Sequence, residues 1–72
     1  MKAGVYKHKR HPKDLYLLIG LARHHHTNEE FIIYVPLRLE KEWEGTARMS
    51  LRTVEDFKNT FEYVAERLPD EL

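Results

Sequence analysis

The fold of this chain is decided by residues 15–23, which read LYLLIGLAR. An extended strand sends successive side chains to opposite faces, and both faces of this stretch are apolar. We therefore expect both faces to be covered, with Leu15, Leu17, Ile19 and Leu21 on one and Tyr16, Leu18, Gly20 and Ala22 on the other. Gly20 has no side chain to pack, so it predicts a bend or bulge that curls a small sheet into a barrel.

Shorter segments around this stretch also have the pattern of strands. Residues 4–8 are rich in aromatic and β-branched side chains, and residues 31–35 (FIIYV) form the clearest strand, which Pro36 ends or passes to a sheet edge. The polar connection before it contains Asn28, which suits a left-handed turn. Residues 46–52 alternate, and we expect Ala47, Met49 and Leu51 to face the core and Arg48, Ser50 and Arg52 to face solvent.

The last third of the chain predicts a helix over about residues 54–68. Thr53 followed by Asp56 resembles a capping box, and Pro69 stops the helix. Apolar side chains recur every three or four positions, at Val54, Phe57, Phe61, Val64 and Leu68. We predict a single domain over residues 1–72 of the α+β class, mainly β: an antiparallel barrel of four to five short strands over about residues 3–52 and one amphipathic C-terminal helix.

Length and composition limit how such a domain is stabilised. A chain of 72 residues without cysteine has a thin core and no disulfide, so a homo-oligomer is expected. No apolar run approaches the roughly 18 residues that cross a bilayer, and a polar run follows the first residues instead of an apolar signal core. We predict no membrane association and a cytoplasmic location.

Charge is divided unevenly along the chain. Residues 1–26 carry a net charge of +5 and residues 27–72 a net charge of −5. This asymmetry indicates either a basic binding surface or pairing between copies of the chain. Basic residues interleaved with aromatic ones near the start have the composition of a nucleic-acid contact, although a solvated turn has it too. The candidate contact residues are Tyr6, Lys7, His8, Lys9, Arg10, Lys13, Tyr16, His24 and Arg48.

Each of these candidates has an expected role. Tyr6 or Tyr16 stacks on a base, and His8 or His24 hydrogen-bonds a base. The phosphate contacts are Lys7, Lys9, Arg10 and Lys13. Arg48 extends the basic surface. Trp43, a large apolar group in a charged connection, either packs on the core or anchors a protein partner. Adjacent residues of an extended chain point to opposite sides, so His24, His25 and His26 do not predict a metal site, and no cofactor is expected.

Several short motifs together resemble a bacterial family of unknown function, the domain of unknown function numbered 1653. The residues that carry the resemblance are Gly4-x-Tyr6-x-His8-Lys9, Tyr16, Ala22-x-His24-x-x-Thr27 and Tyr34-x-Pro36-Leu37. The chain departs from the family pattern at Arg10-His11, His26, Thr46 and Met49. The resemblance implies a small SH3-like or Sm-like barrel and no activity. The positions that match family motifs are Tyr6, His8, His24, Thr27, Tyr34 and Arg48.

The sequence predicts a non-enzymatic binding module for RNA or single-stranded DNA. Small barrels present loops and sheet edges to nucleic acid, which favours this hypothesis by analogy of fold. One alternative is a module for protein interaction or self-assembly, in which the basic half of one copy meets the acidic half of the next. A second alternative is a histidine-dependent nuclease, because imidazole titrates near neutral pH.

Overall fold

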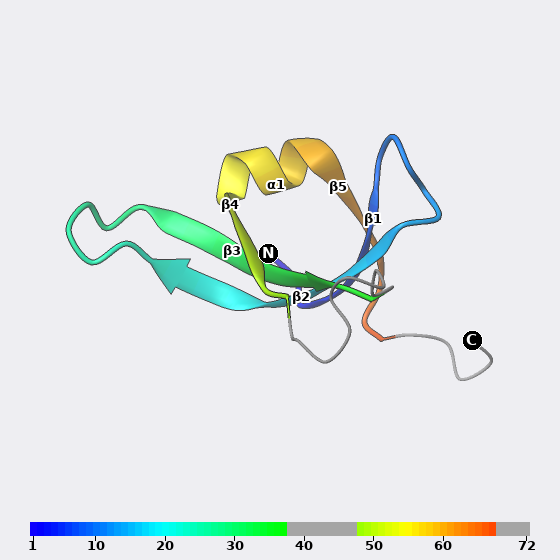
Figure 1. Cartoon of the computed structure of the whole chain (residues 1–72), viewed down its shortest axis with the longest axis horizontal. Helices are drawn as coiled ribbons and strands as arrows, with labels where there is room; N and C mark the ends of the chain where they lie inside the picture. Colours follow the sequence, from blue (N-terminus) through cyan, green and yellow to red (C-terminus); the bar gives the residue numbers. More distant parts are fainter. Residues whose placement is uncertain (38–47, 68–72) are drawn as a thin grey trace.

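The computed structural model describes residues 1–37 and 48–67 of the chain. These residues form a five-stranded antiparallel sheet in the order β4-β3-β2-β1-β5, with one helix between the last two strands (Figure 1). The elements are β1 (Gly4–His8), β2 (Leu15–Arg23), β3 (Glu30–Pro36), β4 (Ser50–Thr53), α1 (Val54–Thr60) and β5 (Phe61–Ala65). The mainly β, antiparallel class predicted from the sequence is confirmed.

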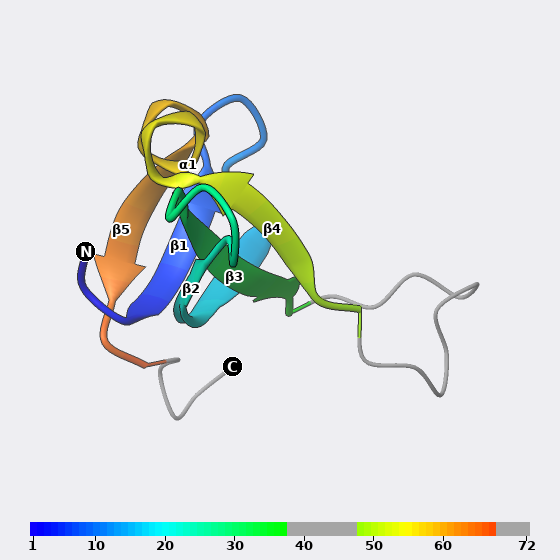
Figure 2. The same cartoon turned by 90° about the vertical axis from the view of Figure 1, so that its left-hand side faces the viewer.

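The sheet is strongly curved but is not closed into a barrel. Its order leaves β4 and β5 at the two edges, and α1 connects them across the curve (Figure 2). The predicted SH3-like or Sm-like barrel is therefore not confirmed. The described parts of the chain contain no helix with the length and apolarity to span a membrane.

The predicted helix begins where expected and ends eight residues early. Thr53 caps it, because its side-chain oxygen accepts a hydrogen bond of 3.1 Å from the backbone N–H of Asp56. The helix stops at Thr60, and Phe61 has extended dihedral angles (φ −121°, ψ 156°). Residues 61–65 form β5, which pairs with β1, while residue 68 lies outside the described residues. The predicted helix was too long because Phe61 and Val64 have the spacing of a helix. Aromatic and β-branched residues are also common in strands.

The predicted orientation of β4 is also wrong. Met49 and Leu51 are 64% and 59% exposed, whereas Arg52 stands opposite Ile32, which is completely buried. Residues directly opposite each other in a sheet share a face, so Arg52 points to the core side. Ala47 lies outside the described residues. The alternation of residue types predicts the period of the strand correctly. It does not show which face Arg52 occupies, because that depends on hydrogen-bond partners in other elements.

In β2, the bend expected at Gly20 is confirmed, and the expected cover on both faces is not. The register with β3 shifts between Leu18, which pairs with Tyr34, and Gly20, which pairs with Ile33. Ile19 is the extra residue of this bulge. It is 51% exposed, and Leu21, which pairs with the buried Ile32, is 58% exposed. Leu15 and Leu17 are half-buried, so the strand is covered only in part.

Aromatic rings fill the concave side of the sheet beneath α1. The Phe57 ring lies edge-on to Tyr6 and Tyr34, with ring centroids 5.0 and 5.4 Å apart, and Phe61 lies 4.6 Å from Phe57. Such edge-to-face contacts stabilise a core beyond its buried area. The buried cluster consists of Tyr6, Leu18, Ile32, Tyr34, Phe57 and Phe61. It unites every strand except β4 with the helix, and therefore fixes where the surface residues of these elements lie.

Two glycines give a matched test of the β1–β5 pairing. Gly4 has φ +140°, and a Cβ there would lie 2.5 Å from the carbonyl oxygen of Ala65; a Cβ at Gly20 meets nothing within 4 Å. We expect Gly4→Ala to lower the free energy of unfolding by about 1–3 kcal/mol. Gly20→Ala should leave it unchanged or raise it by up to about 1 kcal/mol. Urea unfolding measures both, and equal stabilities would contradict the close approach of β5 to β1.

Candidate functional site

A polar cleft of about 400 Å³ lies where the end of β1 meets the C-terminal end of α1. We call it the basic cleft, because three of its side chains carry a positive charge. It is lined by His8, Lys9, Arg10, Arg52, Asn59 and Thr60. Three separate parts of the chain therefore contribute: the end of β1 with the β1–β2 connection, β4 and the end of the helix.

Two hydrogen bonds hold the β1–β2 connection against the helix. The backbone N–H of Lys9 donates to the carbonyl oxygen of Thr60 over 2.9 Å, and the Lys9 ammonium donates to the carbonyl oxygen of Lys58 over 3.0 Å. The last carbonyls of a helix lack partners within it and carry partial negative charge. Lys9 satisfies two such groups at once, which fixes its position at the rim of the cleft.

His8 enters the cleft as a neutral imidazole. Its Nδ1 accepts a hydrogen bond of 3.0 Å from the backbone N–H of Arg10, so in the neutral ring the proton is on Nε2. The ring lies 4.8 Å from that of His11 and 5.5 Å from that of Phe61. Burial, followed by the positive charges of His11 and Arg52, lowers the pKa of His8 below its ordinary value of 6.5. His8 therefore offers an N–H donor without a charge at neutral pH.

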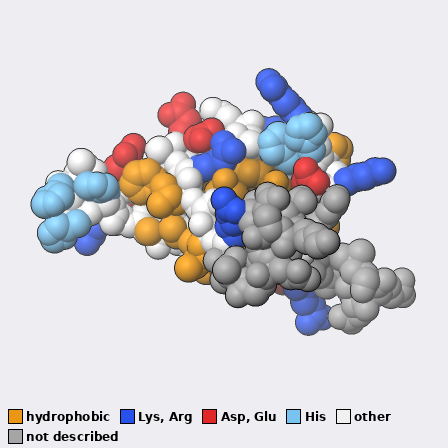
Figure 3. All heavy atoms as spheres, viewed as in Figure 1, with side chains coloured by type: hydrophobic (Ala, Val, Ile, Leu, Met, Phe, Trp, Pro, Cys, Tyr) orange, Lys and Arg blue, Asp and Glu red, His pale blue; other side chains and the backbone are white. Residues whose placement is uncertain are grey.

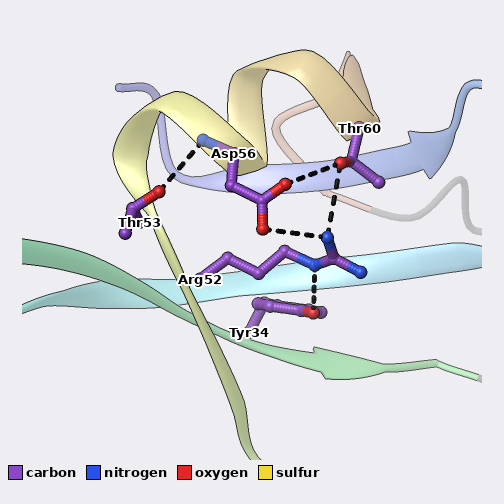
Figure 4. Close-up of polar contacts among 5 residues, drawn as sticks. All are labelled: Tyr34, Arg52, Thr53, Asp56 and Thr60. Carbon is purple, nitrogen blue, oxygen red and sulfur yellow. Dashed lines mark hydrogen bonds and ion pairs between the residues drawn. The ribbon is translucent and has the colours of Figure 1, made fainter.

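Arg52 lines the cleft and is bonded to two other elements. Figure 4 shows these bonds. Its Nε donates to the Tyr34 hydroxyl over 2.8 Å, and one terminal nitrogen donates to the Asp56 carboxylate over 3.1 Å. The same nitrogen lies 3.4 Å from the Thr60 hydroxyl, which in turn donates to Asp56 over 3.3 Å. The guanidinium also stands 5.3 Å from the centre of the Phe61 ring. These contacts explain why Arg52 faces inward.

The electrostatic balance of the cleft is positive. The hydrogen bond that Arg52 donates to the Tyr34 hydroxyl contributes most to raising the pKa of Arg52, and Asp56 adds to it, so this side chain is permanently charged. Lys9 and Arg10 add two exposed cations, whereas Asp56 supplies one negative charge. A cleft with this balance, and with an amide donor from Asn59, is suited to bind an anion.

The structure does not allow the stacking role predicted for Tyr6. The Tyr6 side chain is 3% exposed, and its hydroxyl donates to the carbonyl oxygen of Lys2 over 2.6 Å. Tyr16 is half-buried and packs edge-on against Phe61, with centroids 4.9 Å apart. Both rings serve the core because β1 and β2 lie at the centre of the sheet, where their inner faces are covered.

Only part of the predicted basic cluster comes together. Lys7 forms an ion pair of 3.7 Å with Glu62 across β1 and β5, and it does not line the cleft. Lys13 is exposed in the β1–β2 connection, also outside the cleft lining. Arg48 is exposed just before β4, and position 43, predicted as a partner anchor, lies outside the described residues. Of the predicted contact residues, His8, Lys9 and Arg10 share the cleft.

The histidines form two separate groups at opposite ends of the molecule (Figure 3). His24 belongs to the β2–β3 hairpin, where its Nδ1 accepts from the backbone N–H groups of His26 and Thr27 over 3.2 and 3.3 Å. Asn28 in this hairpin has φ 62°, which confirms the predicted left-handed turn. His24 thus orders a turn and is remote from the basic cleft. Within residues 1–37 and 48–67, no three metal-ligating side chains are grouped.

Asn59 and Thr60 were missed because they lie in the middle of a predicted helix. Arg52 was recognised as a basic residue, but it was placed on the solvent face. The end of α1 and its contact with Lys9 create this part of the site. The one available signal was a polar pair, Asn59-Thr60, before the aromatic and β-branched run of residues 61–64.

Arg52→Lys tests whether the guanidinium network holds the site together. Lysine keeps the charge but cannot bond Tyr34, Asp56 and Thr60 at the same time. We expect the free energy of unfolding to fall by about 1–2 kcal/mol. Arg23→Lys, at an exposed position at the end of β2, is the matched control and should change it by less than about 0.5 kcal/mol. Equal stability of the two variants in urea unfolding would contradict a structural role for the network.

Comparison with known proteins confirms the resemblance seen in the sequence. A family model described as "Protein of unknown function (DUF1653)" matches residues 4–69. The structure is similar to the crystal structure of a DUF1653 protein from Bordetella bronchiseptica, with a TM-score of 0.75 and 28% sequence identity over 97% of this chain and 95% of that chain. No curated protein matches. Because the family match spans nearly the whole chain, this protein belongs to the DUF1653 family.

Proposed function

We propose that this protein is a non-enzymatic binding module whose basic cleft takes the phosphate groups of RNA or single-stranded DNA. One observation carries the proposal: Lys9, Arg10 and Arg52, which come from different parts of the chain, converge on one cleft. Phosphate contacts supply most of the sequence-independent affinity of nucleic-acid-binding proteins. An open cleft with several cations is suited to a polymer of phosphates.

The remaining groups of the cleft also match phosphate chemistry. Phosphate oxygens accept hydrogen bonds and donate none, and both the neutral His8 ring and the Asn59 amide offer donors. Asp56, the acidic group beside the cleft, already accepts from Arg52 and Thr60. The fixed Lys9 and the preformed Arg52 network reduce the side-chain ordering that binding would otherwise require.

Arg10→Gln tests this proposal against a matched loss of charge at Arg23. Arg23 ends β2 beside the hairpin that lies at the far end of the long axis from the β1–β2 connection (Figure 1). In fluorescence anisotropy with a labelled single-stranded oligonucleotide mixture, we expect Arg10→Gln to weaken binding about fivefold, the equivalent of about 1 kcal/mol. The dependence of log affinity on log salt should become shallower by about 0.7. Arg23→Gln should change neither quantity by a comparable amount.

The same assay separates the proposal from its alternatives. Absence of binding at low salt, or equal losses for the Arg10 and Arg23 variants, would contradict a nucleic-acid site in the cleft. Cleavage of the probe that disappears in His8→Gln would instead support the histidine-dependent nuclease. Probe that remains intact throughout is the result expected of a non-enzymatic module.

Self-association is a second candidate, favoured by exposed apolar side chains on the outer face of the sheet. Leu51 stands opposite Ile33, and the bulge residue Ile19 adjoins Gly20, which also stands opposite Ile33. Ile19 and Leu51 are each more than half exposed, as is Met49 before β4. A second copy presents the same apolar face, so two copies would bury it in a symmetric contact.

Leu51→Lys tests this second candidate without disturbing the core, because the Leu51 side chain is exposed. We expect sedimentation of the wild-type protein to show an oligomer, and the charge of Leu51→Lys to shift it towards the monomer. Val64→Lys, in the edge strand β5 and 46% exposed, is the matched control and should keep the wild-type behaviour. A wild-type protein that stays monomeric as its concentration rises would contradict this candidate.

A further inference from the structure

A second hollow, of about 290 Å³, lies beside the same end of α1, and three of its six lining residues are aromatic. We call it the aromatic hollow. Its lining consists of Met1, Lys2, Tyr6, Lys58, Phe61 and Tyr63. The segment 58–61 borders both hollows, since Lys58 and Phe61 line this one and Asn59 and Thr60 line the basic cleft.

Tyr63 is the accessible aromatic wall of this hollow. Tyr6 and Phe61 are 3% and 4% exposed, so they form its base, whereas Tyr63 is only half-buried. The Tyr6 and Tyr63 rings meet edge to face at 5.5 Å, which fixes the plane of Tyr63. An ordered ring with an accessible face is the platform on which single-stranded nucleic acids stack their bases.

The exposed Lys2 side chain lies over the Tyr63 ring. Its ammonium lies 5.1 Å from the centre of the ring, in a cation–π contact. A planar base can replace this contact by stacking on the ring. The released Lys2 and the exposed Lys58 would then face the phosphates on either side of that base.

The linings of the two hollows are in direct contact. Lys9, which lines the basic cleft, donates from its ammonium to the carbonyl oxygen of Lys58, which lines the aromatic hollow. We infer that the aromatic hollow receives an unpaired nucleobase of the same strand whose phosphate occupies the basic cleft. This inference rests on the proposed function. It adds that tight binding requires the bases of the nucleic acid, because one of them stacks on Tyr63.

The test compares two probes of equal charge on the full chain. One is a single-stranded oligouridylate of about eight nucleotides, and the other is a ribose-phosphate oligomer of the same length without bases. The wild-type protein should bind the base-containing probe at least about fivefold more tightly, as expected for one stacked base. Tyr63→Leu should remove this difference without weakening the abasic probe, and Tyr63→Phe, which keeps the ring, should retain it.

The outcomes distinguish the two proposals. If neither probe binds, the nucleic-acid function itself fails. If both probes bind equally and Tyr63→Leu has no effect, the phosphate cleft stands and the base site is overturned. If Tyr63→Leu does not fold, NMR of the wild-type protein tests the same point. The chemical shifts of the Tyr63 ring protons should change with the base-containing probe and not with the abasic one. Equal shifts with both probes would overturn the inference.

Discussion

The inward-facing guanidinium of Arg52 is the interaction on which the arrangement of the site depends. Arg52 lies in an edge strand of only four residues, and it bonds Tyr34 in the neighbouring strand and Asp56 and Thr60 in the helix. A helix of seven residues has little stability of its own in water. The helix is held by the Thr53 cap, by burial of aromatic rings and by this guanidinium. The same contacts therefore stabilise the fold and position the cleft.

The two hollows beside the end of α1 complement each other chemically. One presents cations and neutral donors, and the other presents an accessible aromatic ring with lysines at its rim. Single-stranded nucleic acid has the same two components, charged phosphates and planar bases. Both hollows are bordered by residues 58–61, where the chain changes from helix to strand. The abrupt end of the helix thus creates the surface that we assign to ligand binding.

Features set by local chemistry could be predicted from the sequence. Thr53 caps a helix and Asn28 takes a left-handed turn because each depends on only a few neighbouring residues. The end of the helix at Thr60 could not be predicted in the same way, because β5 forms by pairing with a strand at the other end of the chain. The sheet face that Arg52 occupies and the convergence of three segments on the cleft likewise depend on long-range contacts. The periodicity of the sequence does not predict such contacts.

The pairing of β5 with β1 also determines when this protein can fold. Strand β1 lies inside the sheet with β2 as one neighbour, and its other neighbour is β5, the last described element of the sheet. Until that element leaves the ribosome, the inner side of β1 lacks Phe61 and Tyr63, and one edge of β1 is open. Contacts between such distant segments close large loops and slow the search for the native state. Folding is therefore completed only after β5 has been synthesised, and a nascent chain stalled before β5 presents an unpaired strand to its surroundings.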